Sequence, residues 1–572
     1  MTATPHADLD AAGPQDNKAA ATYNADAYRT FFENDFTYLN GFRRNTKRYA
    51  NRIAISDPDT KEQLTYQQLG ERVDRLAAGL AAAGVGVGDV VAYQLFNGTA
   101  FAELYLATQV LGAVGSPVNF RLAAGETAFV VDISRPKVFV YDTELTPMVT
   151  EALGYATATP QVLVPVGDDA PITTTGATVI TWEDLHADHT DVPTAARTVW
   201  DETTRLYTSG TTGMPKGVPL NSLIEVFSAH DVIMHFPLGP EDKTLNMTPW
   251  FHRGGLYSGG PNPTFYIGGQ VVPLRAFDPD RVLDLVAEEG LTFLIGAPTN
   301  LAMLATAQEA RPRDLSTLRG IVTMGAPLER EAALRYQDLL HPRIFNGYGS
   351  TEGFWNTFLR PGDLPDHAGT AGRACTDDDV RVVHVYGDHL AEPDDVVARD
   401  GEAVGEVIIR SPKCANAYFD SPEQEKAKFH NGWLHIGDLA TWDAEEFVTI
   451  VGRKDDMLIS GGENVHPVQV EEALNQHPQV IDSLVVGIPH DRWGRMVVAY
   501  ILSETADLTP EALDAHCRTH PMLSSFKRPR AYRFVEALPV SATGKKLHYK
   551  ATDSATAEFA SGLFVAPTDP RT

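Results

Sequence analysis

Short apolar runs alternate with helix-patterned segments through the first two-thirds of this chain. Val90–Phe96 is an apolar run of the kind found in a strand that is buried on both faces. A helical pattern follows at Phe101–Leu111. Because strands that alternate with helices form parallel sheets, the sequence predicts an α/β fold of mixed, largely parallel sheets. Further runs of this kind lie at 115–118, 137–141, 161–166, 292–295 and 320–324.

Local signals near the N-terminus predict a hairpin followed by a helix. Two strand-like runs, Ile53–Ser56 and Gln63–Thr65, flank the turn sequence DPDT. Thr65 and Gln68 have the spacing of a capping box, in which the two residues satisfy each other's backbone N–H groups. One apolar stripe at helical spacing follows, formed by Leu69, Val73, Leu76 and Leu80.

A chain of 572 residues is too long for one core, so more than one domain is expected. The pattern of predicted secondary structure changes twice along the chain. From about Asp379, short β-like runs at 380–386 and 405–410 predict a β subdomain that closes the large domain. A second change follows Asp455, which predicts a separate α+β unit of ordinary domain size. We therefore expect a mobile tail at 1–24, a large domain at 25–454 and a small one at 455–572. Within the small unit, the expected elements are helices at 468–475 and 510–518 and strands at 481–486 and 496–502.

Composition restricts the classes of partner. The formal charge of −28 argues against binding nucleic acid or an anionic membrane through bulk charge. Cys375, Cys414 and Cys517 are widely spaced, which indicates neither a disulfide framework nor a zinc site. A reducing, cytoplasmic location is therefore expected. Neither a signal peptide nor a membrane-spanning run is visible in the sequence, so integral membrane association is not expected.

The segment from Thr208 to Gly217, TSGTTGMPKG, has the composition of a phosphate-binding loop. It follows the apolar pair Leu206-Tyr207, which is typical of the end of a strand. Four hydroxyls and three glycines allow side chains and backbone N–H groups to turn inward, and Lys216 adds a positive charge. The spacing differs from that of a Walker P-loop. The alternative interpretation of the segment alone is a polar surface loop.

This segment resembles the signature of the adenylate-forming enzymes, which include acyl-CoA synthetases, adenylation domains and beetle-type luciferases. The resemblance covers nearly the whole chain, because further motifs follow in the family's usual order. It implies a large ATP- and acid-binding domain with a small mobile lid, and it is strongest to the AMP-forming acid:CoA ligases. The further motifs lie at 64–69, 346–352, 405–418, 433–438, 452–467 and 539–545.

The resemblance implies a nucleotide site. Tyr348 corresponds to a tyrosine that lies against adenine, Thr351 to a threonine that reaches the α-phosphate, and Glu352 to a glutamate that holds magnesium, with Thr208 as a second ligand. Asp438 would bind the ribose hydroxyls, although Ile436 replaces the threonine usual before Gly437. The other residues implied at the ATP site are Thr208, Ser209, Gly210, Thr211, Thr212, Gly213, Lys216, Gly325, Ala326, Pro327, Asn346, Gly347, Gly349, Arg453 and Lys545.

The resemblance also implies an acyl pocket. His252 would border the acid's carboxylate, and we include it among the catalytic residues with Lys545, Thr351 and Glu352. The hypothesis is a compact acid, either aromatic or alicyclic, or of medium chain length. Arg253 is unusual at its position, and we interpret it as pointing to solvent; the alternative is recognition of a polar group on the acid. The pocket residues are Trp250, Phe251, His252, Gly254, Gly255, Gly325, Phe354 and Trp355.

In the small domain the resemblance implies a catalytic lysine on a lid. Lys545, in PVSATGK, would enter the site for adenylation and leave for thioester formation, with Asp455 as the hinge. Lys546, the next residue, is interpreted as solvated. Gly461, Gly462 and Lys527 would contact CoA. A solvated cationic turn is the alternative for Lys527 and the two arginines that follow it.

Together these residues predict an AMP-forming acid:CoA ligase that uses ATP, CoA and Mg²⁺. The alternatives are an enzyme that loads a carrier protein, a long-chain fatty acid:CoA ligase, a luciferase-like oxygenase and a nucleotide-binding protein without catalysis. The expected partners are a small carboxylic acid, ATP and CoA, and a homodimer is compatible with the sequence.

Overall fold

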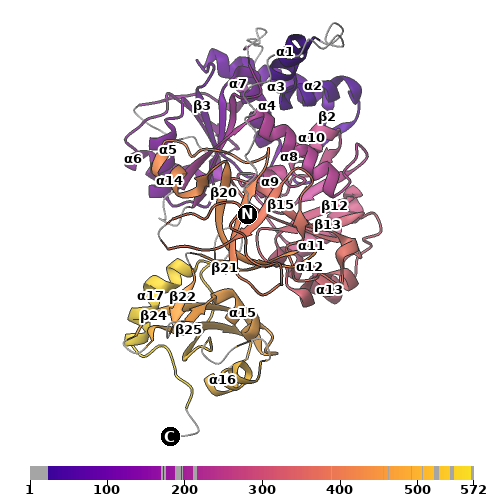
Figure 1. The fold of residues 1–572 in the computed structure, drawn as a ribbon. Helices are drawn as coiled ribbons and strands as arrows, with labels where there is room; N and C mark the ends of the chain where they lie inside the picture. Colours follow the sequence, from indigo (N-terminus) through magenta and orange to yellow (C-terminus); the bar gives the residue numbers. More distant parts are fainter. Residues whose placement is uncertain are drawn as a thin grey trace, which may run out of the picture.

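The computed structural model describes residues 24–568 except 169–171, 173–175, 187–194, 196, 210–214, 388, 455, 461–462, 491–492, 506, 521–522, 524–526 and 541–545. Figure 1 shows a large α/β body, a β-rich part (orange) in the middle of the view and a small C-terminal unit below both. Nearly all of the predicted tail lies outside the described residues, apart from Asn24. The Asn24 side chain accepts a hydrogen bond from Ala27 N and so caps α1.

The first sheet of the large body has seven strands. Neighbouring strands pair in parallel, including β4 with β8, except that β8 and β9 form an antiparallel hairpin at one edge. Its order is β7 (Thr178–Val179), β6 (Val162–Val166), β5 (Val138–Asp142), β3 (Val90–Gln94), β4 (Val114–Pro117), β8 (Glu202–Ser209) and β9 (Pro215–Asn221).

The second sheet has nine strands, with a parallel centre and antiparallel edges. The predicted hairpin forms one edge, and the predicted capping box at Thr65 and Gln68 is confirmed at the start of α3. The order is β16 (Arg373–Ala374), β15 (Phe354–Leu359), β14 (Ile344–Ser350), β13 (Gly320–Met324), β12 (Phe293–Gly296), β10 (Lys243–Asn246), β11 (Gln270–Val271), β1 (Ile53–Ser56) and β2 (Gln63–Thr65).

Helices pack on both sheets because their apolar stripes need a partner surface. One continuous core joins the two sheets through α4, α8 and α10. The helices of this body are α1 (Ala25–Asp35), α2 (Tyr38–Arg48), α3 (Tyr66–Ala82), α4 (Thr99–Leu111), α5 (Ala124–Ser134), α6 (Thr146–Tyr155), α7 (Trp182–Leu185), α8 (Ser222–His235), α9 (Arg253–Tyr257), α10 (Pro261–Ile267), α11 (Pro279–Glu289), α12 (Pro298–Ala310) and α13 (Arg330–Leu339), with 3₁₀ turns at Thr143–Leu145 and Pro361–Asp363.

A five-stranded antiparallel sheet forms the predicted β subdomain. Its first strand ends at Val383, three residues earlier than the sequence pattern predicted. There Val383 forms an isolated bridge with Val396, and the next residue, His384, donates its N–H to Asp395 O at 3.0 Å. The elements are β17 (Asp379–Val383), β18 (Gly405–Arg410), α14 (Pro422–Lys428), β19 (Phe429–His430), β20 (Trp433–Trp442) and β21 (Val448–Arg453).

The C-terminal unit is the predicted α+β domain, so the fold class is confirmed. Its sheet has the order β23, β22, β25, β24, with β26 parallel to β25. Among the helices of the described residues, none is both long and apolar enough to cross a bilayer. The elements are β22 (Leu458–Ser460), β23 (Glu463–Val465), α15 (Pro467–Asn475), β24 (Val480–His490), β25 (Gly494–Ser503), α16 (Pro510–Thr519), β26 (Ala531–Val535) and α17 (His548–Ala560).

Candidate active site

The β8–β9 hairpin carries the ends of the hydroxyl-rich segment. The strands are longer than the sequence predicted, because Thr208 pairs with Lys216 and Ser209 with Pro215. Both ends of the predicted ten-residue loop, 208–209 and 215–217, are therefore strand. The four central residues proposed for phosphate binding, Gly210, Thr211, Thr212 and Gly213, lie outside the described residues.

Tyr418 connects this hairpin to the second predicted motif. Its hydroxyl donates to Glu352 Oε1 at 2.5 Å, and the Lys216 ammonium lies 5.9 Å from the centre of its ring. The backbone N–H of Phe419 donates to Gly217 O at 2.8 Å, which fixes this segment on β9. A cation at the start of β9 and a carboxylate from the other sheet thus share one aromatic neighbour.

Thr351 and Glu352 occupy the turn between β14 and β15. Ser350 pairs with Phe354 across this hairpin, and a bulge lies between Tyr348 and Gly349. A Cβ on Gly349 would lie 1.4 Å from Phe354 O, so only glycine fits there. The turn leads into Phe354, whose φ of 62° is in the left-handed region that bulky side chains disfavour.

A second polar contact set joins β14 to the β subdomain. The Tyr348 hydroxyl donates to Asp438 Oδ2 at 2.8 Å, and Arg453 Nη1 donates to Asp438 Oδ1 at 2.8 Å. Asp438 and Arg453 face each other across β20 and β21. Burial, with a contribution from Asp438, raises the pKa of Tyr348 well above its usual range, so the phenol remains a hydrogen-bond donor.

The predicted adenine-pocket residues follow the neighbouring strand. Met324, the last residue of β13, pairs with Gly347 on β14, so Gly325, Ala326 and Pro327 begin beside Tyr348. A Cβ on Gly325 would meet no atom within 4 Å, which shows open space at this point. Asn346, also implied at this site, is buried in β14.

The predicted acyl segment runs from β10 into α9. Trp250 and Phe251 are buried, and their rings pack edge-on against Phe101 and Phe120, respectively. Burial, assisted by Arg121, lowers the pKa of His252 to about 4, so its imidazole is neutral at pH 7. Trp355 packs in the core against Phe236 and Phe358, with Phe354 stacked on it at 5.1 Å.

The glycines after His252 sit in tight surroundings. A Cβ on Gly254 would lie 3.1 Å from Met324 Cε, and one on Gly255 would lie 1.9 Å from Pro249 O. Gly255 is thus required by the backbone, whereas Gly254 faces the flexible end of a methionine.

Arg253 does not point to solvent, and our interpretation of it was wrong. Its side chain is buried, and Nη1 donates to Thr351 O at 2.5 Å and to Glu352 O at 2.9 Å. Nη2 donates to Lys413 O at 2.8 Å. The guanidinium therefore faces the β14–β15 turn, where two backbone carbonyls, with a third from Lys413 beyond β18, provide the partners that solvent would otherwise supply.

Lys413 is a second buried cation next to this turn, and sequence reasoning did not single it out. Its ammonium donates to Trp355 O at 2.8 Å and pairs with Asp231 at 2.8 Å and Asp378 at 3.1 Å. Asp231 also belongs to a buried group with His235 and Cys375 whose ligand atoms are close enough to hold a metal ion. Lys413 already supplies a cation to that group, so the carboxylate charge has a partner.

In the C-terminal unit, the predicted lid residues Lys545, Asp455, Gly461 and Gly462 lie outside the described residues. Lys527 Nζ donates to Gln469 Oε1 at 2.6 Å. Its neighbour Arg528 pairs with Asp514, which leaves less free charge in this basic patch than the sequence indicated.

Lys546 is not solvated as predicted. Its ammonium pairs with Asp482 at 2.7 Å and Glu471 at 3.1 Å, and His548 Nε2 lies 2.6 Å from the other Glu471 oxygen. Although burial opposes it, Lys546 and His548 lower the pKa of Glu471 to about 2. The expectation failed because the two carboxylates that pair with Lys546 come from α15 and β24, which sequence proximity does not reveal.

Family comparison assigns both parts of the chain. A model described as AMP-binding enzyme matches residues 42–419, and one described as AMP-binding enzyme C-terminal domain matches residues 469–545. The chain belongs to the family of AMP-binding enzymes.

Relatives and solved structures resemble this AMP-binding enzyme over most of their length. A feruloyl-CoA synthase of Amycolatopsis is 33% identical over 85% of this chain and 92% of its own. A long-chain-fatty-acid–CoA ligase of Mycobacterium tuberculosis is 31% identical over 86% and 93%, respectively. The anthranilate CoA ligase AuaEII, solved with anthranoyl-AMP, matches with a TM-score of 0.81 at 25% identity, over 92% of this chain and 98% of its own. The prediction of an AMP-forming acid:CoA ligase that uses ATP and CoA is confirmed.

The site of this AMP-binding enzyme thus gathers most of the described motif residues at one junction. There, Tyr418 links the β8–β9 hairpin to Glu352, and Tyr348 links β14 to Asp438 in the β subdomain. These contacts lie at the carboxyl ends of β13 and β14, as expected for a ligand site in an α/β fold. Sequence reasoning missed Tyr418, although it noted the segment 405–418. A tyrosine followed by Phe419 and an acidic residue was the only local signal.

Proposed function

We propose that this enzyme activates a compact apolar carboxylic acid, aromatic or alicyclic, as an acyl-adenylate and transfers it to CoA. The observation that carries the proposal is the Tyr418 bridge between Lys216 and Glu352. It brings the phosphate-binding hairpin and the Thr351–Glu352 turn to one place, as adenylation of an acid requires.

The nucleotide would lie between these elements. Asp438, held by Tyr348 and Arg453, presents a carboxylate that can accept hydrogen bonds from the two ribose hydroxyls. Thr351 would contact the α-phosphate while the acid attacks its phosphorus in line. Fixed donors at this point offset charge that develops in the transition state.

Glu352 and Thr208 would hold Mg²⁺. A carboxylate and a hydroxyl are the oxygen donors that this hard cation prefers, and Tyr418 fixes one Glu352 oxygen, so the residues fit the ion. Bound there, magnesium would neutralise charge on the departing pyrophosphate.

The compact acid is supported by the surroundings of His252. The Phe251 ring packs on the His252 imidazole, and Phe120 packs edge-on against Phe251. The imidazole is neutral, which suits an apolar group. Because Arg253 faces inward, it offers no cation to a polar substituent on the acid. The acids named for two of the relatives, ferulate and anthranilate, are aromatic. A long-chain fatty acid remains the second candidate, since the M. tuberculosis relative takes one.

The small domain would act in two orientations. Lys545 would stabilise charge during adenylation, and rotation about Asp455 would then bring Gly461, Gly462 and Lys527 to CoA, whose thiolate displaces AMP. We further propose a cytoplasmic homodimer. The three buried free thiols support a reducing compartment.

The test is pyrophosphate release with benzoates, cinnamates, alicyclic acids and fatty acids of graded length. We expect the highest kcat/KM for a ring-containing acid, and best turnover of a long straight-chain acid would refute the compact pocket. Thioester formation with CoA, but not with a phosphopantetheinylated carrier protein, would exclude the carrier-loading alternative.

A variant separates the two half-reactions. Lys545→Ala should abolish most adenylation but spare thioester formation from supplied acyl-AMP, whereas the exposed Lys550→Ala on α17 serves as the matched control. Equal loss in both half-reactions would contradict the two-orientation scheme.

A further inference from the structure

Arg253 lies directly after His252, at the start of α9, yet its side chain crosses to the β14–β15 turn. One nitrogen, Nη1, holds the carbonyls of Thr351 and Glu352, two successive residues. The other, Nη2, holds Lys413 O at 2.8 Å and Ser228 Oγ at 3.3 Å. The planar guanidinium can serve these partners at once because its donors point in fixed directions.

The turn that Arg253 holds is strained and would relax without such contacts. Phe354 has a φ of 62°, a conformation that costs a bulky residue free energy and persists only where its surroundings enforce it. The guanidinium lies 5.3 Å from the centre of the Phe354 ring, within the range of a cation–π contact. Arg253 therefore touches the turn at three successive points of its path, from Thr351 through Glu352 to Phe354.

The backbone contacts also determine where the side chains point. The carbonyls of Thr351 and Glu352 face the buried Arg253 guanidinium. This contact fixes the backbone of both residues and therefore the direction in which each side chain leaves it. Glu352 then reaches the Tyr418 hydroxyl on the nucleotide side. The backbone N–H of the buried Ala415 donates to the same Glu352 carbonyl at 2.8 Å, so two donors hold this carbonyl.

We propose that Arg253 is a positioning residue, which holds the Thr351–Phe354 turn so that the Thr351 hydroxyl and Glu352 carboxylate face ATP. It links the acid-binding segment, through its neighbour His252, to the nucleotide-binding turn. The inference rests on the proposed function, because Thr351 and Glu352 are assigned to ATP there.

The test is a double-mutant cycle on single-turnover adenylation, measured as pyrophosphate release at saturating ATP and acid. Arg253→Met should lower the rate about 100-fold, since misplacing a reacting group by roughly 1 Å costs about that much. Arg253→Lys, which can hold one carbonyl but not two, should recover part of the rate. In a Thr351→Ala/Glu352→Gln background, Arg253→Met should cost less than about 3-fold, because residues that act as a unit are not additive.

Amide hydrogen exchange provides a readout that does not depend on turnover. Exchange in peptides covering 350–356 should rise at least about 10-fold in either Arg253 variant, while the β8–β9 hairpin keeps its wild-type protection. If Arg253→Met does not fold, Arg253→Lys carries both the cycle and the exchange measurement.

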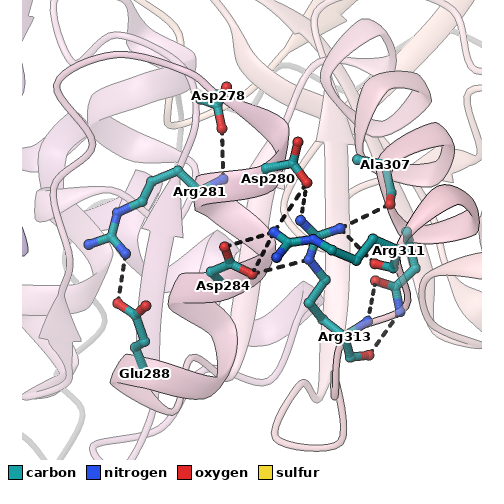
Figure 2. Close-up of polar contacts among 9 residues, drawn as sticks. Asp278, Asp280, Arg281, Asp284, Glu288, Ala307, Arg311 and Arg313 are labelled. Carbon is teal, nitrogen blue, oxygen red and sulfur yellow. Dashed lines mark hydrogen bonds and ion pairs between the residues drawn. The ribbon is translucent and has the colours of Figure 1, made fainter.

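Arg313 offers a matched control far from the site. Figure 2 shows it between α11 and α12, where its Nη1 also donates to two backbone carbonyls, those of Ala307 at 2.9 Å and Arg311 at 2.6 Å. It pairs with Asp280 and Asp284 as well. Arg313→Met should therefore remove an equivalent clamp, with unchanged adenylation and unchanged exchange at 350–356.

The outcomes separate the two proposals. A wild-type enzyme that releases no pyrophosphate with any acid refutes the proposed function, and the nucleotide role of Arg253 with it. An active wild type whose Arg253→Lys and Arg253→Met variants adenylate at the wild-type rate refutes only the role of Arg253. The role of Arg253 is also refuted if its rate loss is fully additive with that of Thr351→Ala/Glu352→Gln, or if amide exchange at 350–356 is unchanged in the Arg253 variants.

Discussion

Replacing Lys413 by methionine should destabilise the large domain strongly, although the two side chains are similar in length. The Lys413 ammonium is almost fully buried, and so are the Asp231 and Asp378 carboxylates that it pairs with. It also donates to Trp355 O at 2.8 Å. Lys413→Met would leave two carboxylates and a carbonyl buried without their cation.

The size of the effect follows from these three contacts. Removing one partner of a buried ion pair typically costs about 3–5 kcal/mol, because the remaining charge is uncompensated. Burial already raises the pKa of Asp378, and Lys413 opposes that rise. Although burial opposes them, His235 and Lys413 hold the pKa of Asp231 below its usual value. Without the cation, the pKa of Asp378 should rise further above the unfolded value, and the pKa of Asp231 should rise as well. Protonation would then relieve the cost at low pH, so the deficit should grow as pH rises from 5 to 8.

Urea unfolding followed by tryptophan fluorescence at pH 5, 6.5 and 8 measures the free energy of unfolding. We expect a deficit of about 3–5 kcal/mol at pH 8 and a clearly smaller one at pH 5. Adding Asp378→Asn to Lys413→Met should recover part of the stability at pH 8, because it removes one unpaired charge.

Lys243→Met is the matched control, since this partly buried lysine donates to the Glu289 carbonyl at 2.6 Å. Lys243→Met should lower the free energy of unfolding by about 1–2 kcal/mol, and this loss should not depend on pH. A Lys413→Met deficit below about 1 kcal/mol, or one that does not change with pH, would refute the assignment of Lys413 as the counter-charge of this pair.

Three further predictions concern single side chains. Asp438→Asn should raise the KM for ATP about 10- to 100-fold with a smaller change in kcat. The substitution weakens charged hydrogen bonds that the enzyme makes equally in the ground and transition states. Steady-state kinetics measures both constants, and a large loss of kcat would show instead that Asp438 acts in the chemical step. Burial, followed by Glu329 and Glu471, raises the pKa of Glu472 to about 7. The stability that the Glu472 carboxyl contributes at low pH is therefore lost as pH rises through 7. Glu472→Gln should raise the melting temperature at pH 8 but not at pH 5. Equal shifts of the melting temperature at the two pH values would contradict this. The pKa of His252 is about 4 in the folded protein against 6.5 when unfolded, so the stability that it contributes above pH 6.5 falls as pH drops towards 4. His252→Gln should therefore flatten the acid side of the curve of melting temperature against pH. An unchanged curve would contradict this.

Patterns within short segments predicted the elements well because their causes are local. Apolar runs marked the buried strands such as β3 and β13, and the Thr65–Gln68 spacing marked the start of α3. The motif residues also gather near one junction, as the family resemblance implied. The predicted roles of the site residues stay predictions, including those of Lys545 and the centre of the hydroxyl-rich segment.

Partners distant in the chain were not predictable in the same way. Arg253 and Lys546 both read as solvated charges in sequence, yet each is held by groups from other elements. Tyr418 carried only a weak local signal, and its role depends on reaching Glu352, 66 residues away.

The sequence alone determined the strand and helix pattern, the two-part organisation and the chemistry for which the motif residues are suited. These depend on periodicity and residue type, which are properties of neighbouring positions. Only the tertiary structure decided which buried charges face each other around the β14–β15 turn. A buried cation takes whichever carbonyls and carboxylates the packed sheets bring within reach, and that choice is made by the fold as a whole.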